Sequence, residues 1–288
     1  MKYNPHKYQS YATDFIISHP IAAVFLEMGL GKSIITLTAI TKLKAEDAIC
    51  KVLVIAPLRV ARDTWPQEIK KWDHLKGMKY AVAVGTEAER KAAVLKNEPV
   101  TVINRENVDW LINKSGLPFD FDMVVIDELS SFKNYRAMRF KALRKVRPFM
   151  KRIVGLTGTP TSNGLMDLWA EIGILDMGER LGKFIGRYRE AYFKPGSMNP
   201  AQGIVYSYVP REGAEEMIYK RIEDITISMK AMDYLKMPER IESEYVVKMD
   251  EKELDRYMAL KSNMILPNEE ITAANAATLC GKLVQMAN

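Results

Sequence analysis

The stretch FLEMGLGKSIITL, residues 25–37, sets a glycine-rich turn between an apolar run and a helical pattern. It ends as a phosphate-binding loop ends, with Gly31, Lys32 and Ser33, although the usual G-x-x-x-x-G-K-[ST] pattern requires glycine where this chain has Leu26. After a strand and before a helix, such glycines let backbone N–H groups turn inward around phosphate oxygens, and the helix N-terminus adds partial positive charge. The stretch therefore predicts a nucleotide site; the alternative is a glycine turn with a helix-start Ser.

Short apolar runs alternate with amphipathic stretches through the first 175 residues. Runs rich in Val and Ile that end at turn residues, which predict buried strands, lie at 21–26, 51–56, 80–84, 100–103, 123–126 and 152–156. Helical patterns lie near 33–45, 61–73, 86–96, 105–113 and 135–147. This alternation predicts βαβ units, and hence an α/β fold with a mostly parallel central sheet flanked by helices. Ligands of such sheets bind at the carboxyl ends of the strands.

The pattern changes beyond residue 176. Residues 178–203 contain Gly and Pro punctuation without a strong strand, which predicts helices and loops. Residues 242–249 alternate like a strand, 250–261 resemble a capped helix, and 271–288 follow a helical pattern. We therefore expect a nucleotide-binding lobe at 1–175 and a helical, connecting extension at 176–288.

Composition describes a globular chain of 288 residues with 48% hydrophobic content, enough for a sizeable core. Cys50 and Cys280 have no metal-type spacing, which favours a reducing compartment. No signal peptide or membrane-length apolar run is present in the sequence, so we expect no membrane association and a location in the cytoplasm of a bacterial or phage-infected bacterial cell.

The net charge of +6 comes from one segment, residues 133–152, which holds nine of the 42 Lys and Arg and no acid. A solvated helix face with its flanks is one interpretation of such a charge run. The other is a patch that meets nucleic-acid phosphates, whose binding would weaken steeply with salt.

A second chemical element is MVVIDELSSFKN at 123–134, where two acids follow four apolar residues. At the carboxyl end of a strand, Asp127 is suited to order a Mg²⁺ shell, and Glu128 to orient and deprotonate an attacking water. Lys32 would contact the β- and γ-phosphates of ATP, and Ser33 would hold Mg²⁺ through its hydroxyl. We expect this acidic pair and the Lys32 turn to converge on neighbouring strand ends. An ordinary turn with an exposed Glu128 is the alternative.

A third element is RIVGLTGTPTSN at 152–163. Thr157 and Thr159 follow another predicted strand, so we expect their hydroxyls beside the acidic pair, where they would sense the state of the γ-phosphate and couple it to the rest of the chain. A tight turn with hydroxyl caps is the alternative interpretation.

Taken together, four stretches resemble the ordered motifs of superfamily-two helicases, most closely the Swi/Snf-type ATPases in a short version associated with bacteriophage genomes. The stretches are LEMGLGKS (26–33), APLRVARDTWPQEIKKW (56–72), VVIDELSSFKN (124–134) and LTGTPTSNGLMDLW (156–169). The resemblance covers nearly the whole chain and implies a RecA-like fold for its first lobe. Phosphate loops of this family often lack the first glycine, which accounts for Leu26.

The resemblance implies further site residues. Gln9 matches the family's adenine-reading glutamine, whose amide pairs with a ring nitrogen and the amino group; a surface polar residue is the alternative. The nucleotide-binding loop would comprise Met28, Gly29, Leu30, Gly31, Lys32, Ser33 and Ile34. Motif positions that touch a nucleic-acid backbone in such enzymes are Pro57, Leu58, Arg59, Asn104, Arg105, Thr161, Ser162 and Asn163. Loop Ser, Thr and Asn are otherwise common turn residues.

The resemblance also implies a function. Such motors hydrolyse Mg-ATP in a cleft between two RecA-like lobes, with an arginine of the second lobe completing transition-state stabilisation, and they move on duplex DNA. We expect this chain to be the first lobe, cut before the second and weak in hydrolysis alone. A nucleotide-gated module that binds nucleic acid without motor activity is the second hypothesis. A small-molecule P-loop kinase is a third, which accounts for neither Glu128 nor the LTGTP stretch.

Some features depart from the family pattern or only imitate it. Leu129 and Ser130 stand where many relatives have Ala-His, so a contact between ATP and the third motif must be made differently or lost. IGRYRE at 185–190 superficially resembles the arginine-finger motif of a second lobe, but helix-surface arginines are the better interpretation. Trp65 and Trp72 lie seven residues apart, which favours core packing over base stacking.

Overall fold

The protein is described by a computed structural model that covers residues 1–158, 161, 164–199, 204–230, 248–263, 265–266, 271–272 and 276–287. The predicted strand at 242–249 lies largely outside these residues. The chain divides into two compact units, Met1–Met237 and Pro238–Asn288. Within the described residues, no helix combines the length and the apolar character needed to cross a bilayer.

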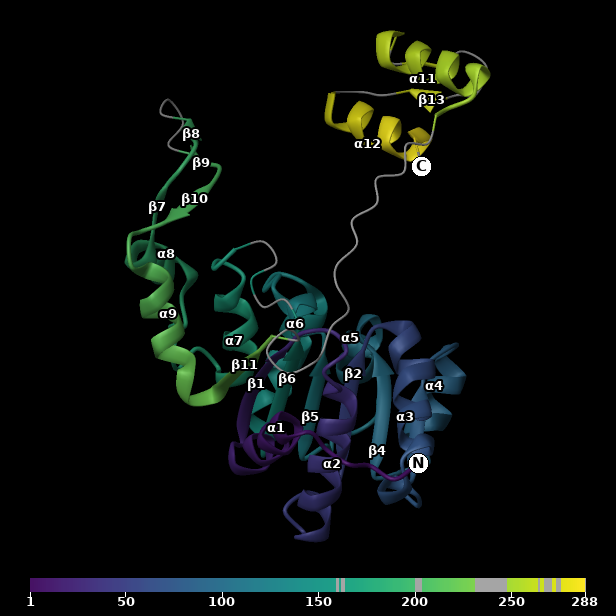
Figure 1. The fold of residues 1–288 in the computed structure, drawn as a ribbon, viewed down its shortest axis with the longest axis vertical. Coiled ribbons are helices and arrows are strands. Elements are labelled where there is room, and N and C mark those ends of the chain that lie inside the picture. The colour runs from purple at the N-terminus through teal and green to yellow at the C-terminus, as the bar shows by residue number, and fades with distance from the viewer. Residues whose placement is uncertain are drawn as a thin grey trace. The chain divides into compact units, whose positions relative to one another are not determined.

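A seven-stranded sheet organises the first unit, in the order β11-β1-β6-β5-β2-β4-β3 (Figure 1). Every neighbouring pair runs parallel, and all six predicted strands are present, so the predicted α/β fold is confirmed. The strands are β1 (Ile21–Leu26), β2 (Val52–Ala56), β3 (Tyr80–Ala83), β4 (Val100–Asn104), β5 (Met123–Asp127), β6 (Arg152–Thr157) and β11 (Thr226–Met229). The outer strand β11 comes from beyond residue 176, where no such strand is predicted.

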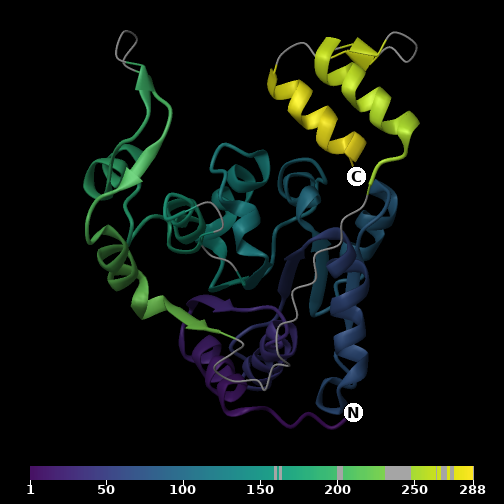
Figure 2. The same cartoon turned by 45° about the horizontal axis from the view of Figure 1, so that its top comes forward.

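Helices cover both faces of this sheet because alternate strand residues point to opposite sides. In β1, Ala23 and Phe25 belong to one buried cluster, whereas Ala22, Val24 and Leu26 belong to the other. The first cluster includes residues of α4 to α9, and the second includes residues of α1 to α3. Figures 1 and 2 show these helices around the strands from two directions.

The helices between residues 32 and 147 match the predicted positions, and the structure adds α1, which carries Gln9, as well as α7 and α9. Their bounds are α1 (Lys7–Ser18), α2 (Lys32–Ala45), α3 (Trp65–Lys71), α4 (Glu87–Leu95), α5 (Val108–Asn113), α6 (Met138–Val146), α7 (Leu168–Asp176), α8 (Ile185–Tyr192) and α9 (Ala214–Ile222). Short helical turns are η1 (Val60–Thr64), η2 (Asp73–Leu75), η3 (Arg105–Asn107), η4 (Leu129–Phe132), η5 (Arg147–Phe149) and η6 (Glu223–Ile225).

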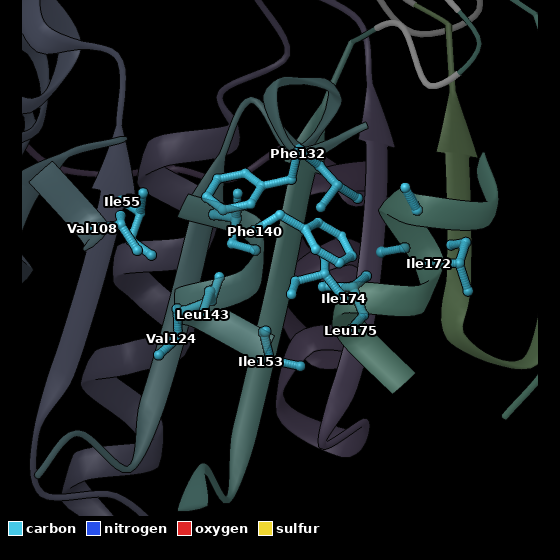
Figure 3. Close-up of a cluster of buried hydrophobic side chains, with 14 of the residues drawn as sticks. Ile55, Val108, Val124, Phe132, Phe140, Leu143, Ile153, Ile172, Ile174 and Leu175 are labelled. Atoms are coloured by element: carbon cyan, nitrogen blue, oxygen red, sulfur yellow. The ribbon is translucent and has the colours of Figure 1, made fainter. Parts of the chain in front are cut away.

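Helix α7 lies deepest in this core, because all nine of its residues are buried. Figure 3 shows its apolar side chains Ile172, Ile174 and Leu175 with Phe132 of η4 and Phe140 of α6. A helix that is buried all round normally carries no charge. The two carboxyl groups of α7 therefore call for an explanation.

Two smaller parts lie outside the sheet. A ribbon formed by β7 (Phe193–Pro195) and β10 (Tyr208–Pro210) extends beyond α8, away from the sheet, in both views (Figures 1 and 2), with β8 (Met198–Asn199) and β9 (Ile204–Val205) at its far end. The prediction of only helices and loops at 178–203 was thus wrong for β7 and β8, which contain three and two residues. The second unit contains α11 (Glu251–Asn263), β12 (Ile265–Leu266), β13 (Ile271–Thr272) and α12 (Ala276–Ala287). The helix α11 agrees with the pattern at 250–261, whereas the pattern at 271–288 was wrong for its first two residues, which form β13.

Candidate functional site

The loop between β1 and α2 has the backbone of a phosphate-binding turn. Gly29 and Gly31 have φ angles of 86° and 82°, in the left-handed region that side chains disfavour. Gly31 is the N-cap of α2, so the first free N–H groups of that helix face the loop. Leu30 and Ile34 are buried beneath it, whereas the side chain of Met28 is exposed.

Lys32 closes this loop on itself. Its Nζ donates to the carbonyl oxygens of Leu26, at 2.7 Å, and Glu27, at 3.4 Å. Burial lowers the pKa of Lys32, and the negative charges of Asp127 and Glu128 oppose that shift. The ammonium group is thus half-buried and within the field of both acids, and its hydrogen bonds among the described residues go to neutral carbonyl oxygens.

The acidic pair and Lys32 lie at the same edge of the sheet. The expectation of neighbouring strand ends was wrong in one detail: β6 lies between β1 and β5. The parallel register sets Phe25 beside Thr157 and Asp127 beside Leu156, so all three strands end at the same level. The strand between the two motifs is the one that ends in Thr157.

Asp127 is held by a tryptophan. The indole N–H of Trp65, a fully buried side chain, donates to Oδ2 of Asp127 at 2.8 Å. Burial nevertheless raises the pKa of Asp127, because desolvation outweighs this hydrogen bond and the field of Lys32. Trp65 therefore packs in the core, as the sequence favours, and also orients a site carboxyl group, which no pattern in the sequence indicates.

Glu128 has an unusual backbone, with φ 70° and ψ 70° in the left-handed region. Such a conformation costs a non-glycine residue about 1–3 kcal/mol and is typical of functional sites. Its Oε1 accepts hydrogen bonds from Oγ1 of Thr157, at 2.8 Å, and from Oγ of Ser130. Thr157 of the third motif and Ser130 thus orient the carboxyl group of Glu128.

Leu129, the other departure from the family pattern, is a packing residue. It is fully buried, and a Cβ built on Gly155 of β6 would lie 2.7 Å from its Cδ2. The larger side chain after the acidic pair therefore depends on a glycine in the neighbouring strand.

A cleft of about 660 Å³ lies over the phosphate loop, within the first unit. Its lining includes Gln9, Gly31, Lys32, Ser33, Trp72 and Asp127. Gln9 is buried, its Nε2 donates to the carbonyl of Leu30 at 3.3 Å, and its Oε1 accepts from the N–H of His6 at 3.0 Å. A Cβ on Gly31 would lie 2.8 Å from that Nε2, so Gln9 and the loop are in direct contact.

The third motif contacts the phosphate loop through its backbone. A Cβ built on Gly158 would lie 3.4 Å from the carbonyl oxygen of Leu26. Thr161 is half-buried and hydrogen-bonded to Tyr219. Thr159, Ser162 and Asn163 lie outside the described residues.

The candidate nucleic-acid contacts lie after β2 and β4, which are neighbours in the sheet. Leu58 and Arg59 are exposed and Pro57 is half-buried. Asn104 is buried, and its amide donates to Glu106 at 2.9 Å and accepts from Asn107 at 2.5 Å.

Arg105 pairs with the adjacent Glu106, Nε to Oε1 at 2.9 Å. Arg105 and Asn104 are therefore occupied by neighbours within the chain. Arg59, by contrast, is exposed and forms no side-chain hydrogen bond or ion pair with another described residue.

Several basic side chains of the segment 133–152 donate hydrogen bonds to backbone carbonyls of the same chain and so stabilise the fold. Arg147 is buried and donates to the carbonyl of Leu175 at 2.7 Å, Arg139 donates to the carbonyl of Ser131, and Arg152 donates to carbonyls at the end of α1. In α8, the guanidinium groups of Arg187 and Arg189 lie over the rings of Phe184 and Tyr208. Neither set of contacts requires a ligand.

Mg²⁺ prefers oxygen ligands, and two residues of the cleft can supply them. Asp127 and the hydroxyl of Ser33 both line the cleft, and the raised pKa of Asp127 is the mark of a carboxyl group whose charge a cation would stabilise. Among the described residues, no three His, Cys, Asp or Glu side chains gather as a metal site. The residues thus fit a cation that takes its remaining ligands from a bound phosphate and water.

With this geometry established, the chain was compared with known proteins. Residues 23–284 match the SNF2-related domain. The chain belongs to the SNF2-related family. Members of this family are ATPases of the superfamily-two helicase type, so the chain belongs to a nucleotide-using family of enzymes.

Two relatives place this SNF2-related chain more closely. The putative protein p41 of Acyrthosiphon pisum secondary endosymbiont phage 1 is 33% identical over 296 residues, which cover 99% of this chain and 64% of p41. Helicase ssl-1 of Caenorhabditis elegans is 31% identical over 148 residues, 50% of this chain and 6% of ssl-1. The chain thus spans less than two thirds of either relative.

The SWI2/SNF2 ATPase core of Sulfolobus solfataricus, solved in complex with double-stranded DNA, has the same fold, with a TM-score of 0.66 and 21% sequence identity. The match covers 99% of this chain and 58% of the Sulfolobus chain.

Proposed function

We propose that this SNF2-related chain is the ATP-binding lobe of a motor that hydrolyses Mg-ATP to move on duplex DNA. The observation that supports this proposal is the convergence of Lys32, Asp127 and Glu128 at one edge of the sheet, beside the 660 Å³ cleft. A half-buried ammonium group that bonds to neutral carbonyls in the field of two acids is typical of a functional site.

Each residue has a role in this proposal. Lys32 exchanges its two carbonyl partners for the β- and γ-phosphates, and the backbone N–H groups of the loop receive the remaining phosphate oxygens. Ser33 and Asp127 hold Mg²⁺, which when bound neutralises charge on the phosphates. Gln9, already in contact with the loop, recognises the adenine base.

Glu128 is the general base of this proposal. Its carboxylate orients the attacking water and accepts a proton from it, while hydrogen bonds from Thr157 and Ser130 fix its Oε1. Thr157 and Thr159 connect the phosphate state to the rest of the lobe. Thr157 is the better supported of the two, because it bonds directly to Glu128.

Duplex DNA and a second lobe belong to the same proposal. The Sulfolobus relative was solved with double-stranded DNA, and both it and p41 extend well beyond the matched length. Pro57, Leu58, Arg59, Asn104, Arg105, Thr161, Ser162 and Asn163 are the proposed DNA contacts. The segment from 176 onward would lead to the second RecA-like lobe, which would supply the missing arginine.

Steady-state ATP hydrolysis, with and without duplex DNA, tests the proposal on these 288 residues. We expect turnover below ~1 per second, because catalysis lacks the arginine of the second lobe. Glu128→Gln should reduce the rate by about 10²–10⁴-fold with ATP affinity retained, since general bases contribute that much.

Two outcomes would count against this assignment. Failure to bind ATP would remove the nucleotide site, and a Glu128→Gln rate equal to that of the unchanged chain would remove the general base. DNA-stimulated turnover at ~1 per second or faster would refute the need for a second lobe.

A further inference from the structure

Helix α7 carries two buried carboxyl groups that differ in their hydrogen bonding. Asp176, at its end, accepts hydrogen bonds from the backbone N–H groups of Gly178, at 2.8 Å, and Arg180, at 2.9 Å. Glu171, in its middle, is fully buried, and neither of its oxygens has a hydrogen-bond partner within the described part of the chain. An ionised carboxylate is not stable in such surroundings, because it has lost its hydration and gained nothing in return.

The turn that follows Glu128 lies against this helix. η4 has Glu128 as its N-cap and Lys133 as its C-cap, and it packs on α7. Nζ of Lys133 lies 3.3 Å from Oδ2 of Asp167, the N-cap of α7. This ion pair joins the far end of the turn that begins at Glu128 to α7.

Glu171 lies one helical turn beyond Asp167, so it shares the same neighbourhood. The charged groups whose fields reach it are Asp167 on its own helix and Lys133 and Glu128 at the two ends of η4. From α9, the phenol of Tyr219 lies within the field of Glu171. The strands β1 and β6 and helix α6 contribute apolar side chains of the same core, including Phe25, Ile153 and Phe140.

We propose that Glu171 is a positioning residue for ATP hydrolysis: as an uncharged acid it leaves Lys133 to Asp167, and this ion pair holds the turn on which Glu128 sits. This inference rests on the proposed function of Glu128. If Glu171 ionised, a second carboxylate would compete for Lys133, and the turn would lose its fixed attachment to α7.

The protonation equilibrium of Glu171 determines the pH range in which it would compete for Lys133. Burial, followed by the field of Asp167, raises the pKa of Glu171 to about 8, whereas Lys133 opposes the shift. The acid is therefore uncharged at neutral pH and ionises at mildly alkaline pH. The arrangement makes hydrolysis sensitive to alkaline pH through a group that never touches the nucleotide.

The pH profile of hydrolysis at saturating Mg-ATP tests the inference. In the unchanged chain the rate should fall about tenfold from pH 7 to pH 9, since the protonated fraction of a group with a pKa near 8 falls from about nine-tenths to about one-tenth. Glu171→Gln, which is uncharged at every pH, should keep the neutral rate and lose this fall. An equal alkaline fall in Glu171→Gln would overturn the inference while leaving the proposed function intact.

Asp176→Asn is the matched control, because it neutralises the other buried acid of α7. It should lower stability at every pH and keep the alkaline fall in rate. Lys133→Met should reduce hydrolysis at every pH with unchanged ATP affinity, because it removes the ion pair itself.

Unfolding curves provide a readout that needs no ATP. An acid whose pKa is raised in the folded state makes the unfolded state lose its proton first, so stability falls as pH rises from about 4.5 to about 8. The melting temperature of the unchanged chain should therefore fall relative to that of Glu171→Gln over this range. Parallel curves would overturn the inference, whereas absence of hydrolysis at every pH with diverging curves would overturn the proposed function instead.

Discussion

Two halves of the same sheet edge hold their polar side chains in opposite ways. Over β1, β6 and β5, two hydrogen bonds join side chains that lie far apart in sequence: Trp65 donates to Asp127 across 62 residues, and Thr157 donates to Glu128 across 29. Over β2 and β4, Asn104 and its neighbours bond within three residues of themselves. The first half is assembled by the fold, and the second by its own loops.

This difference separates two kinds of motif match. On the first half, burial lowers the pKa of Lys32 and raises that of Asp127, so both groups are pushed toward their uncharged forms and would be restored by a ligand of opposite charge. On the second half, Asn104 and Arg105 already have partners of their own. The charged groups of the first half therefore favour ligands of opposite charge, whereas Asn104 and Arg105 of the second half are satisfied within the chain.

The largest effect is expected at the lysine of the first half. Lys32→Ala should weaken ATP binding by up to about 100-fold, because a charge-assisted hydrogen bond contributes about 1.5–3 kcal/mol. Calorimetric titration measures the affinity, and circular dichroism checks the fold.

Lys42→Ala is the matched control for that experiment. Lys42 belongs to the same helix, but it is exposed, and within the described residues its ion pair is with Asp14 at 3.4 Å. Its loss should change ATP affinity less than about twofold, as expected for a surface ion pair. Equal affinities in the two variants would contradict the assignment of the phosphate loop.

A smaller effect is expected at Trp65, which bonds to the proposed metal ligand Asp127 and not to the metal itself. Trp65→Phe keeps a ring in the core but removes the donor to Asp127, leaving a buried acceptor unpaired at a cost of about 1–3 kcal/mol in stability. With its carboxyl group no longer oriented, the gain in ATP affinity on adding Mg²⁺ should shrink about tenfold. Titrations with Mg²⁺ and with EDTA give this ratio.

Trp72→Phe makes the same chemical change at a neighbouring position. Its indole N–H donates to Glu68 at 2.7 Å, away from the acidic pair, although its ring lines the same cleft. ATP affinity itself can change in this variant, but the ratio with and without Mg²⁺ should not. If the two variants changed the ratio alike, the Trp65 hydrogen bond would have no special role at the metal site.

The same contrast explains what the sequence could predict. Runs of Val and Ile predict six strands, and parallel strands end at one edge, so the meeting of Lys32 with the acidic pair follows from local patterns. The bond between Trp65 and Asp127 does not, because nothing in a helix pattern says which distant side chain an indole meets. The strand β11 was missed because four residues, Thr226–Met229, carry too little pattern, and its pairing with β1 crosses some 200 residues.

The burial of Glu171 could not be predicted from its local sequence. A single acid in the apolar stretch LWAEIGIL would ordinarily be placed on a solvated face, and only the burial of all of α7 makes it exceptional. Ser130 is similar, since its bond to Glu128 depends on the left-handed backbone of that residue. Positions where tertiary structure overrides local pattern are where functional sites are expected.

The smallest effect is expected in the second half, where two arginines can be set against each other. Arg59 is exposed and forms no hydrogen bond or ion pair within the described part of the chain, whereas Arg62, three residues on, pairs with Asp63 through Nε at 2.9 Å and Nη2 at 2.9 Å. If the turn after β2 meets a DNA backbone, Arg59→Ala should weaken duplex binding a few-fold at every sequence and reduce the slope of log K against log salt by about 1. Arg62→Ala removes the same charge but frees Asp63, so its effect on that slope should differ from that of a lost phosphate contact. Identical slopes for both variants would mean that only net charge matters there, and the second half of the edge would then have no defined contact with DNA.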